Sequence, residues 1–180
     1  GAHTLFFGPQ TIGGVINYLT PDAPRIPGGF VQVAAGERSY FNGHLRVSGH
    51  GALLDYVRKE GDGARENLKH QVDDLNFKYT KRAGDRHTLT FRANRYTEDS
   101  TVTYSGLTQA EYERLGAHYN PFRNDSFDIG RTGVSLTHQL DLADRTRVTT
   151  NAYYSSFDRD WWRQSSNSQV GKRISAARWI

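Results

Sequence analysis

The stretch HQVDDLNFKYTKRAGDRHTLTFRANRYT, residues 70–97, decides the fold class of this 180-residue chain. Apolar side chains occupy alternate positions in both halves of the stretch: Leu75, Phe77, Tyr79, Leu89, Phe91 and Ala93. The positions between them are mostly polar, which is the two-residue period of a β-strand with two unlike faces. Residues 83–86 have the composition of a tight turn, so the stretch predicts a β-hairpin.

The same alternation recurs along most of the chain. It predicts seven strands, at residues 30–36, 41–49, 53–60, 70–82, 87–97, 127–142 and 147–159. Most of the connections are sorted by length: the short ones lie around residues 50–51, 83–86 and 143–145, and the long ones at 61–69, 98–125 and beyond 160. Short and long connections therefore lie at opposite ends of the sheet, as in outer-membrane barrels with short periplasmic turns and longer extracellular loops.

The loop at 98–125 contains a helix signal. Thr108 and Glu111 have the spacing of a capping box, which predicts a short helix near residues 109–115.

Composition narrows the possible functions. Hydrophobic residues make up 36% of the chain and aromatic residues 12%, too much for a disordered chain, and the absence of cysteine excludes a disulfide scaffold and thiolate zinc sites. No apolar run reaches the roughly 18 residues of a transmembrane helix, which leaves strands of alternating polarity as a way to cross a membrane. The net charge of +4 comes mostly from scattered arginines and suits an anionic small ligand or nucleic acid.

Signatures of catalysis are missing from the sequence. There is no His-Glu-x-x-His run and no nucleophile elbow. Asp73 and Asp74 are adjacent, but neighbours in a strand point to opposite faces and cannot share a proton. We therefore predict that the protein is not an enzyme and has no cofactor or metal site.

A proline-rich boundary lies near the start of the chain. An apolar strand pattern at residues 11–20 is ended by Pro21, Pro24 and Pro27. The boundary divides the chain into residues 1–27 and residues 28–180.

The sequence FGPQTIGGVINYLTP, residues 7–21, resembles the end of the plug domain in TonB-dependent outer-membrane receptors. The motif positions are Gly8, Pro9, Gln10, Gly13, Gly14 and Asn17. In this family a plug fills a 22-stranded barrel. The resemblance implies an all-β fold: about seven strands of a transmembrane antiparallel barrel over residues 28–180, preceded by the C-terminal end of the plug and its hinge over residues 1–27. Seven strands cannot close a barrel, because closed bacterial barrels have an even number of strands.

Within the family the chain is most similar to ferric citrate receptors, through residues 107–112, Tyr153-Tyr154-Ser155 and residues 171–174. This implies a fragment of a receptor in the bacterial outer membrane that imports an anionic ferric chelate, either ferric citrate or a related siderophore. Iron would be cargo within the chelate and no cofactor. The implied partners are the TonB complex, reached through an N-terminal segment missing from this chain, and outer-membrane lipid, with no nucleic acid.

An oxygen-rich anionic chelate needs arginine donors near the extracellular ends of the strands. Arg159 and Arg178 match positions where ferric citrate receptors carry ligand-contacting arginines, and Arg95 and Tyr96 at the top of the fifth strand are further candidates. Lys78 and Arg92 are expected to line the lumen and to pair with carboxylates of the plug.

A second interpretation is a soluble all-β module that binds an acidic glycan or nucleic acid through a basic, aromatic face. The barrel interpretation differs in predicting that one face of the hairpin at residues 70–97 contacts lipid.

Overall fold

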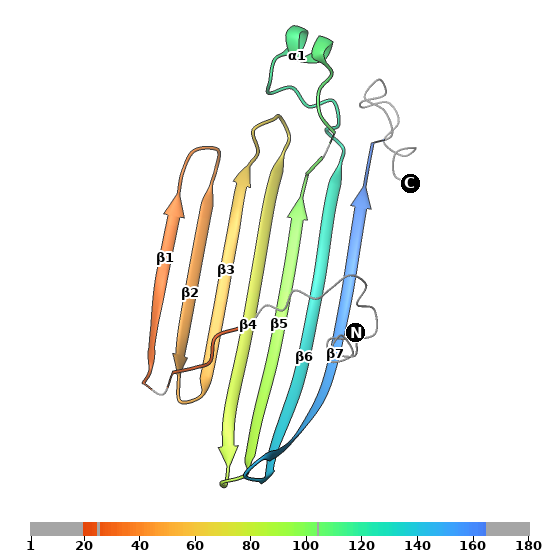
Figure 1. The fold of residues 1–180 in the computed structure, drawn as a ribbon. Helices are drawn as coiled ribbons and strands as arrows, with labels where there is room; N and C mark the ends of the chain where they lie inside the picture. The colour runs from red at the N-terminus through yellow and green to blue at the C-terminus, as the bar shows by residue number, and fades with distance from the viewer. Residues whose placement is uncertain (1–19, 25, 104, 165–180) are drawn as a thin grey trace.

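Seven antiparallel strands form one sheet in the computed structural model, which describes residues 20–24, 26–103 and 105–164 (Figure 1). The strands follow one another across the sheet in chain order. They are β1 (Gly28–Ala35), β2 (Phe41–Gly49), β3 (Ala52–Asp62), β4 (Lys69–Ala83), β5 (His87–Ser100), β6 (Ser126–Ala143) and β7 (Thr146–Trp162). All seven predicted strands are therefore confirmed.

The strands extend further than the sequence pattern predicted. β5 continues to Ser100, and β7 continues to Trp162. The reason is that backbone pairing continues through polar residues: Asp99 of β5 lies opposite both Gln71 of β4 and Asp128 of β6. Backbone hydrogen bonds do not require apolar side chains, so the polarity of these positions hid the strand ends.

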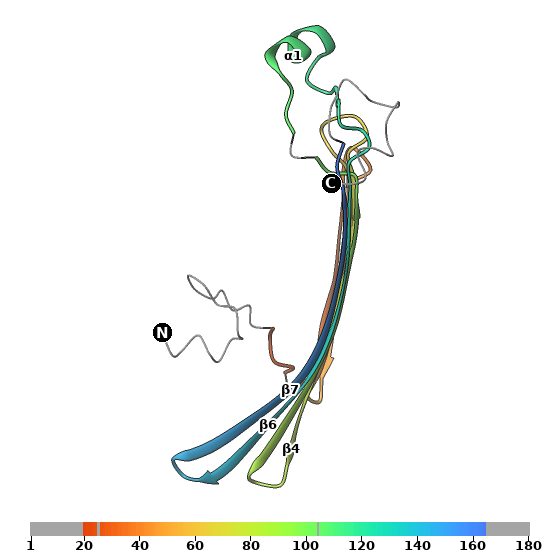
Figure 2. The same cartoon turned by 90° about the vertical axis from the view of Figure 1, so that its right-hand side faces the viewer.

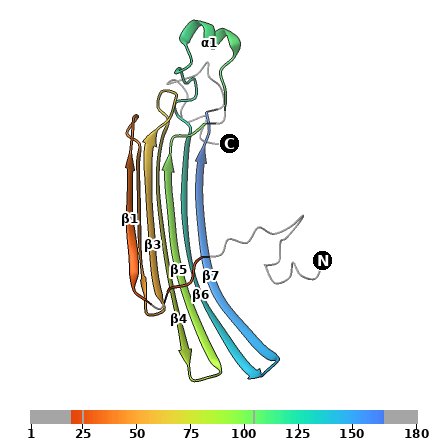
Figure 3. The same ribbon diagram turned by 60° about the vertical axis from the view of Figure 1, so that its left-hand side comes forward.

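The long connections gather at one end of the sheet, with the only helix of the described residues at its tip (Figures 1 and 3). This helix, α1 (Gln109–Leu115), begins with the predicted capping box. The backbone N–H of Glu111 donates to the Thr108 hydroxyl at 3.3 Å, and the backbone N–H of Thr108 donates to the Glu111 carboxylate at 2.9 Å. Across the described part of the chain, no helix has both the length and the apolar character needed to cross a membrane.

Cross-strand register gives the sheet two faces of unlike chemistry. One face, called the outer face, carries an apolar band that runs across all seven strands. The band consists of Val31, Leu45, Val47, Leu54, Leu75, Phe77, Tyr79, Leu89, Phe91, Val134, Leu136, Leu140 and Val148. Its residues meet directly across the strands, as where Phe77 lies between Leu54 and Ala93. The predicted alternation in residues 70–97 is therefore confirmed.

The opposite face, called the inner face, is polar. It carries the intervening residues, among them Arg46, Asp55, Asn76, Lys78, Arg92, Asn94, Tyr96, Glu98, Arg131 and Gln139. The sheet is curved, and residues 20–24 lie on its concave side (Figure 2). They contact Lys78, so the concave side is the inner face.

Polar side chains within the outer face pair with one another. His87 and His138 meet across β5 and β6 with 2.9 Å between Nδ1 and Nε2, and their ring planes are parallel within 2°. A hydrogen bond between the two rings satisfies one donor and one acceptor next to Leu89 and Leu140 of the apolar band.

The turn between β2 and β3 depends on a glycine. Gly51 has a φ of 85°, and a Cβ there would come 2.3 Å from the backbone oxygen of Thr80. Gly84, in the turn between β4 and β5, has a φ of 66°, and a Cβ added there would have no atom within 4 Å.

We predict that Gly51→Ala lowers the free energy of unfolding more than Gly84→Ala. Both variants bear the cost of about 1–2 kcal/mol for a left-handed L-residue, and only Gly51→Ala adds the clash with Thr80.

Urea unfolding of the detergent-refolded full-length protein, followed by tryptophan fluorescence, would measure both changes. Equal losses for the two variants would contradict the close approach of Gly51 to β4.

Candidate functional site

The inner face near the long loops brings together aromatic and basic side chains from three strands. Tyr96 of β5 lies opposite Arg131 of β6, which in turn lies opposite Phe157 of β7. One row closer to the loops, Arg159 lies opposite Ile129. Arg131 and Arg159 are therefore diagonal neighbours, an arrangement that places Cα atoms about 7–8 Å apart. These residues, with Glu98, are called the upper wall.

Tyr96 is held by its hydrogen bond to Glu98. Its hydroxyl donates to Glu98 Oε2 at 2.7 Å, and the Ser100 hydroxyl donates to the other carboxylate oxygen at 2.9 Å. These residues lie on the loop side of the apolar band. Burial, and then the hydrogen bond and charge of Glu98, raise the pKa of Tyr96 to about 12. The phenol therefore keeps its proton at neutral pH and stays fixed as a donor to Glu98.

The two arginines of the upper wall lie on the concave side of the sheet, and among the described residues their guanidinium groups have no hydrogen-bond acceptor. The Arg131 guanidinium carbon lies 5.6 Å from the centroid of the Tyr96 ring, a cation–π contact that leaves its N–H groups available. Arg159 is exposed and, among the described residues, has neither a hydrogen bond nor an ion pair. A guanidinium group can donate a forked pair of hydrogen bonds to a carboxylate.

The loops beyond the upper wall are tied together by a buried asparagine. Asn120 is 1% exposed; its side chain donates to the Glu66 carbonyl at 3.0 Å and accepts from the Phe122 backbone N–H at 3.0 Å. The Glu66 backbone N–H donates to the His118 carbonyl at 2.7 Å. The loop after β3 and the loop after β5 therefore form one unit.

This loop unit also holds the end of β7. The Gln164 backbone N–H donates to the Asp125 carboxylate at 2.6 Å, and its side chain donates to the Pro121 carbonyl at 2.9 Å. Gln164 follows β7 by two residues, so the strand that carries Phe157 and Arg159 is fixed against the loop after β5.

The sequence matches no protein-family model. Two solved structures share the arrangement of the strands. One is the ferric citrate transporter FecA in its unliganded form, with a TM-score of 0.74 and 23% identity; the match covers 88% of this chain and 26% of that protein. The other is the ferric-catecholate import receptor Fiu from Escherichia coli K12 in an open form, with a TM-score of 0.65 and 16% identity. That match covers 80% of this chain and 25% of the receptor.

This sheet has the fold of part of those receptors. The chain spans about a quarter of the length of either structure. The resemblance to ferric-chelate receptors predicted from the sequence is confirmed at the level of the fold, as is an all-β partial barrel.

The structure separates the site residues that the sequence predicted. Tyr96 and Arg159 share the inner face of the receptor fold. Arg95 lies on the outer face, where it donates to the Thr132 hydroxyl at 3.2 Å. The remaining positions lie outside the described residues: Arg178 and the plug-end motif Gly8, Pro9, Gln10, Gly13, Gly14 and Asn17.

Arg131 was not predicted from the sequence. It lies on the polar side of a strand whose alternation was recognised, so its face could have been predicted. Its contact with Tyr96 depends on the pairing register of β5 and β6, which alternation alone does not specify.

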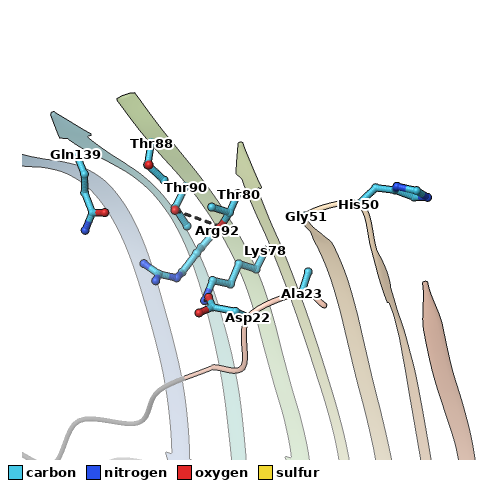
Figure 4. Close-up of a pocket in the computed structure, with 10 residues that line it drawn as sticks. All are labelled: Asp22, Ala23, His50, Gly51, Lys78, Thr80, Thr88, Thr90, Arg92 and Gln139. Atoms are coloured by element: carbon cyan, nitrogen blue, oxygen red, sulfur yellow. Dashed lines mark hydrogen bonds and ion pairs between the residues drawn. The ribbon is translucent and has the colours of Figure 1, made fainter. Parts of the chain in front are cut away.

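A second polar region of the inner face lies near the short turns, where residues 20–22 cross β4. Lys78 is 6% exposed, and its ammonium group contacts the Asp22 carboxylate at 2.5 Å (Figure 4). Lys78 thus pairs with a carboxylate from residues 1–27, and the assignment of these residues to a plug stays a prediction. The hydrogen bond and charge of Lys78, followed by the charge of Arg92, lower the pKa of Asp22 below its ordinary 3.8.

This contact borders a polar cavity of about 650 Å³. Its lining includes Thr80, Thr88, Thr90, Arg92 and Gln139. Within the described ranges, no cluster of three or more histidine or acidic side chains could hold a metal ion. Beside the carboxylate of Asp22, the cavity offers the hydrogen-bond donors of its threonines and Gln139 and the cation of Arg92, and these donors and this cation suit the binding of anions.

We predict that Glu98→Gln lowers the pKa of Tyr96 from about 12 towards its ordinary 10. The substitution removes the charge of Glu98 and weakens the hydrogen bond, since an amide oxygen replaces the carboxylate as acceptor, and it leaves burial and the charge of Asp74 in place. NMR of ring-labelled tyrosine, with Tyr96→Phe to assign the signal, would measure the pKa. Glu60→Gln, on the outer face, is the matched control and should leave the titration of Tyr96 unchanged.

An unchanged Tyr96 titration in Glu98→Gln would contradict the close contact of the Glu98 carboxylate with the Tyr96 hydroxyl.

Proposed function

We propose that this chain is part of an outer-membrane receptor that binds an anionic ferric chelate, ferric citrate or a related siderophore, and imports it in a TonB-dependent manner. The observation that carries the proposal is the presence of two guanidinium groups, those of Arg131 and Arg159, which have no hydrogen-bond acceptor among the described residues. They share with Tyr96 the inner face of a sheet with the receptor fold. The names of the two similar structures, a ferric citrate transporter and a ferric-catecholate import receptor, support the substrate class.

The outer face supports a location in a membrane. In β4 the apolar band runs from Leu75 to Tyr79, after which Lys81 follows on the same face, and in β6 it runs from Val134 to Leu140. These stretches are shorter than the roughly 9–11 residues with which a tilted strand crosses a bilayer. Beyond the band, on the loop side, the outer face becomes charged, with Asp99, Asp128 and Asp160 in one row. Lipid would thus contact the band, with the long loops extracellular and the short turns periplasmic.

The proposed mechanism consists of binding and release, without covalent chemistry. Arg159 and Arg131 would donate to carboxylate or other anionic oxygens of the chelate. Tyr96 would present its ring and keep Arg131 in place, since its hydroxyl is bound to Glu98. Arg178 remains a candidate for a further donor. Release would require work from the TonB complex, because strong charge-assisted contacts must be broken before the chelate passes inward.

We predict that Arg159→Ala weakens the binding of ferric citrate by the full-length receptor about 10- to 100-fold. A hydrogen bond to a charged group contributes about 1.5–3 kcal/mol, and each 1.4 kcal/mol is a factor of ten. Isothermal titration calorimetry of the purified receptor in detergent would measure the change.

Arg95→Ala is the matched control for this measurement. It removes the same charge one residue from Tyr96 but on the outer face, so affinity should stay within about twofold of the wild type. Equal effects of the two substitutions, or no effect of Arg159→Ala, would exclude Arg159 from the site.

Labels on adjacent residues of β4 test the membrane location. We predict that lipid-soluble oxygen increases the spin relaxation rate of a nitroxide attached at position 77 of the full-length protein in vesicles, because Phe77 lies in the apolar band. A nitroxide at Asn76, on the inner face, should respond instead to a water-soluble relaxation agent. If both labels report the same aqueous surroundings, the soluble binding module becomes the better interpretation.

A further inference from the structure

We propose that Lys78 is a positioning residue that anchors the segment leading into β1, so that residues 20–22 form the fixed end of the N-terminal part of the chain. The anchor itself is independent of the proposed function. Its effect on import rests on that function.

One ammonium group binds three consecutive residues of the segment. Lys78 Nζ lies 3.3 Å from the Thr20 carbonyl, 3.4 Å from the Pro21 carbonyl and 2.5 Å from Asp22 Oδ1. An ammonium has three donors, so these three acceptors can use all of them. Among the described residues, these are the hydrogen bonds that join residues 20–24 to the sheet.

Lys78 is buried and Asp22 is exposed, so the contact holds the segment of residues 20–22 against a fixed residue of the sheet. The side chain of Asp22 is 88% exposed, whereas Lys78 is 6% exposed. Thr20 and Pro21 are also exposed, so apolar packing does little to hold the segment. Departure of the segment from the wall would break all three contacts of the ammonium group at once, and their loss opposes that departure.

The segment has a second fixed point where it enters the sheet. Pro27 packs against Gly49 at the end of β2, so closely that a Cβ on Gly49 would lie 2.8 Å from the Pro27 Cα. Lys78 lies on β4, two strands away from β2. A pull applied upstream of Thr20 would therefore load the Lys78 contact before it reached Pro27 and β1.

The ion pair is suited to a permanent anchor at neutral pH. The lowered pKa of Asp22 keeps its carboxylate charged at neutral and mildly acidic pH. Because folding lowers the pKa of Asp22, the contribution of the ion pair to folding stability is fully present above the ordinary pKa of 3.8. That contribution is lost as the pH falls through the lowered pKa of Asp22.

A nitroxide on Ala23 tests the anchor in the full-length protein. This chain has no cysteine, so Ala23→Cys introduces the only labelling site within it. We expect an immobilised spectral component in the otherwise unchanged protein and its loss in Lys78→Met, which keeps the length of the side chain and removes its donors. Lys78→Arg should restore the immobilised component. Lys81→Met, on the outer face of the same strand, should leave it unchanged.

Asp22→Asn provides a second variant in case Lys78→Met does not fold. Asp22 is exposed, so its substitution tests the contact without emptying a buried position, and it should also release the label. A label that stays immobilised in Asp22→Asn, and in Lys78→Met where that variant folds, would overturn the anchor.

Ferric citrate binding and uptake by the same variants separate the anchor from the proposed function. We expect the Lys78→Met receptor to bind ferric citrate but to lose uptake. The Lys78→Arg receptor should both bind and take up ferric citrate. Normal uptake with a mobile label would overturn the positioning role. Absence of ferric citrate binding by the wild-type receptor would contradict ferric citrate as the ligand and leave the spectroscopic result on the anchor intact.

Discussion

Backbone hydrogen bonding between neighbouring strands is the interaction on which the rest of this structure depends. Among the described residues, Leu53, at 2% exposure, and Pro121 are the only apolar side chains that are buried. Most of the other apolar side chains project from the outer face, where they contribute little packing within the sheet. The continuous ladder from β1 to β7 satisfies backbone N–H and C=O groups, as any strand in a hydrocarbon environment requires.

The register of this ladder decides which side chains can act together. A slip of one residue would move every side chain of a strand to the other face. Arg95 and Tyr96 are adjacent in the chain and separated by the sheet, whereas Tyr96 and Arg131 come from different strands and touch. The same rule directs Lys78 towards Asp22 and its strand neighbour Lys81 away from it. The upper wall and the Lys78 contact are therefore two consequences of one pairing pattern.

The sequence allowed the two-faced strands and the helix in the long loop to be predicted, because both have local causes. Alternation at Leu75, Phe77 and Tyr79 reflects the pleat, and the capping box of α1 needs only Thr108 and Glu111. The grouping of Arg95 with Tyr96 overlooked the same two-residue period, which could have separated them.

Other features could not be predicted because they have non-local causes. The polar ends of β5 and β7 belong to the sheet because their neighbours continue beside them. The contact of Arg131 with Tyr96 requires the register of two strands joined by a loop that spans residues 101–125.

The two outermost strands have a consequence for how this chain behaves apart from the rest of a barrel. Within the described residues, β1 and β7 each have a partner strand on one side only. β7 is 17 residues long, and its exposed aromatic side chains include Tyr153 at 75% and Phe157 at 59% exposure. A long edge of unpaired backbone groups is a template for the addition of further strands, whether from a second copy or from another extended peptide. Closure of the barrel would thus protect against aggregation as well as enclose a lumen, and the isolated sheet would tend towards β-assembly in water.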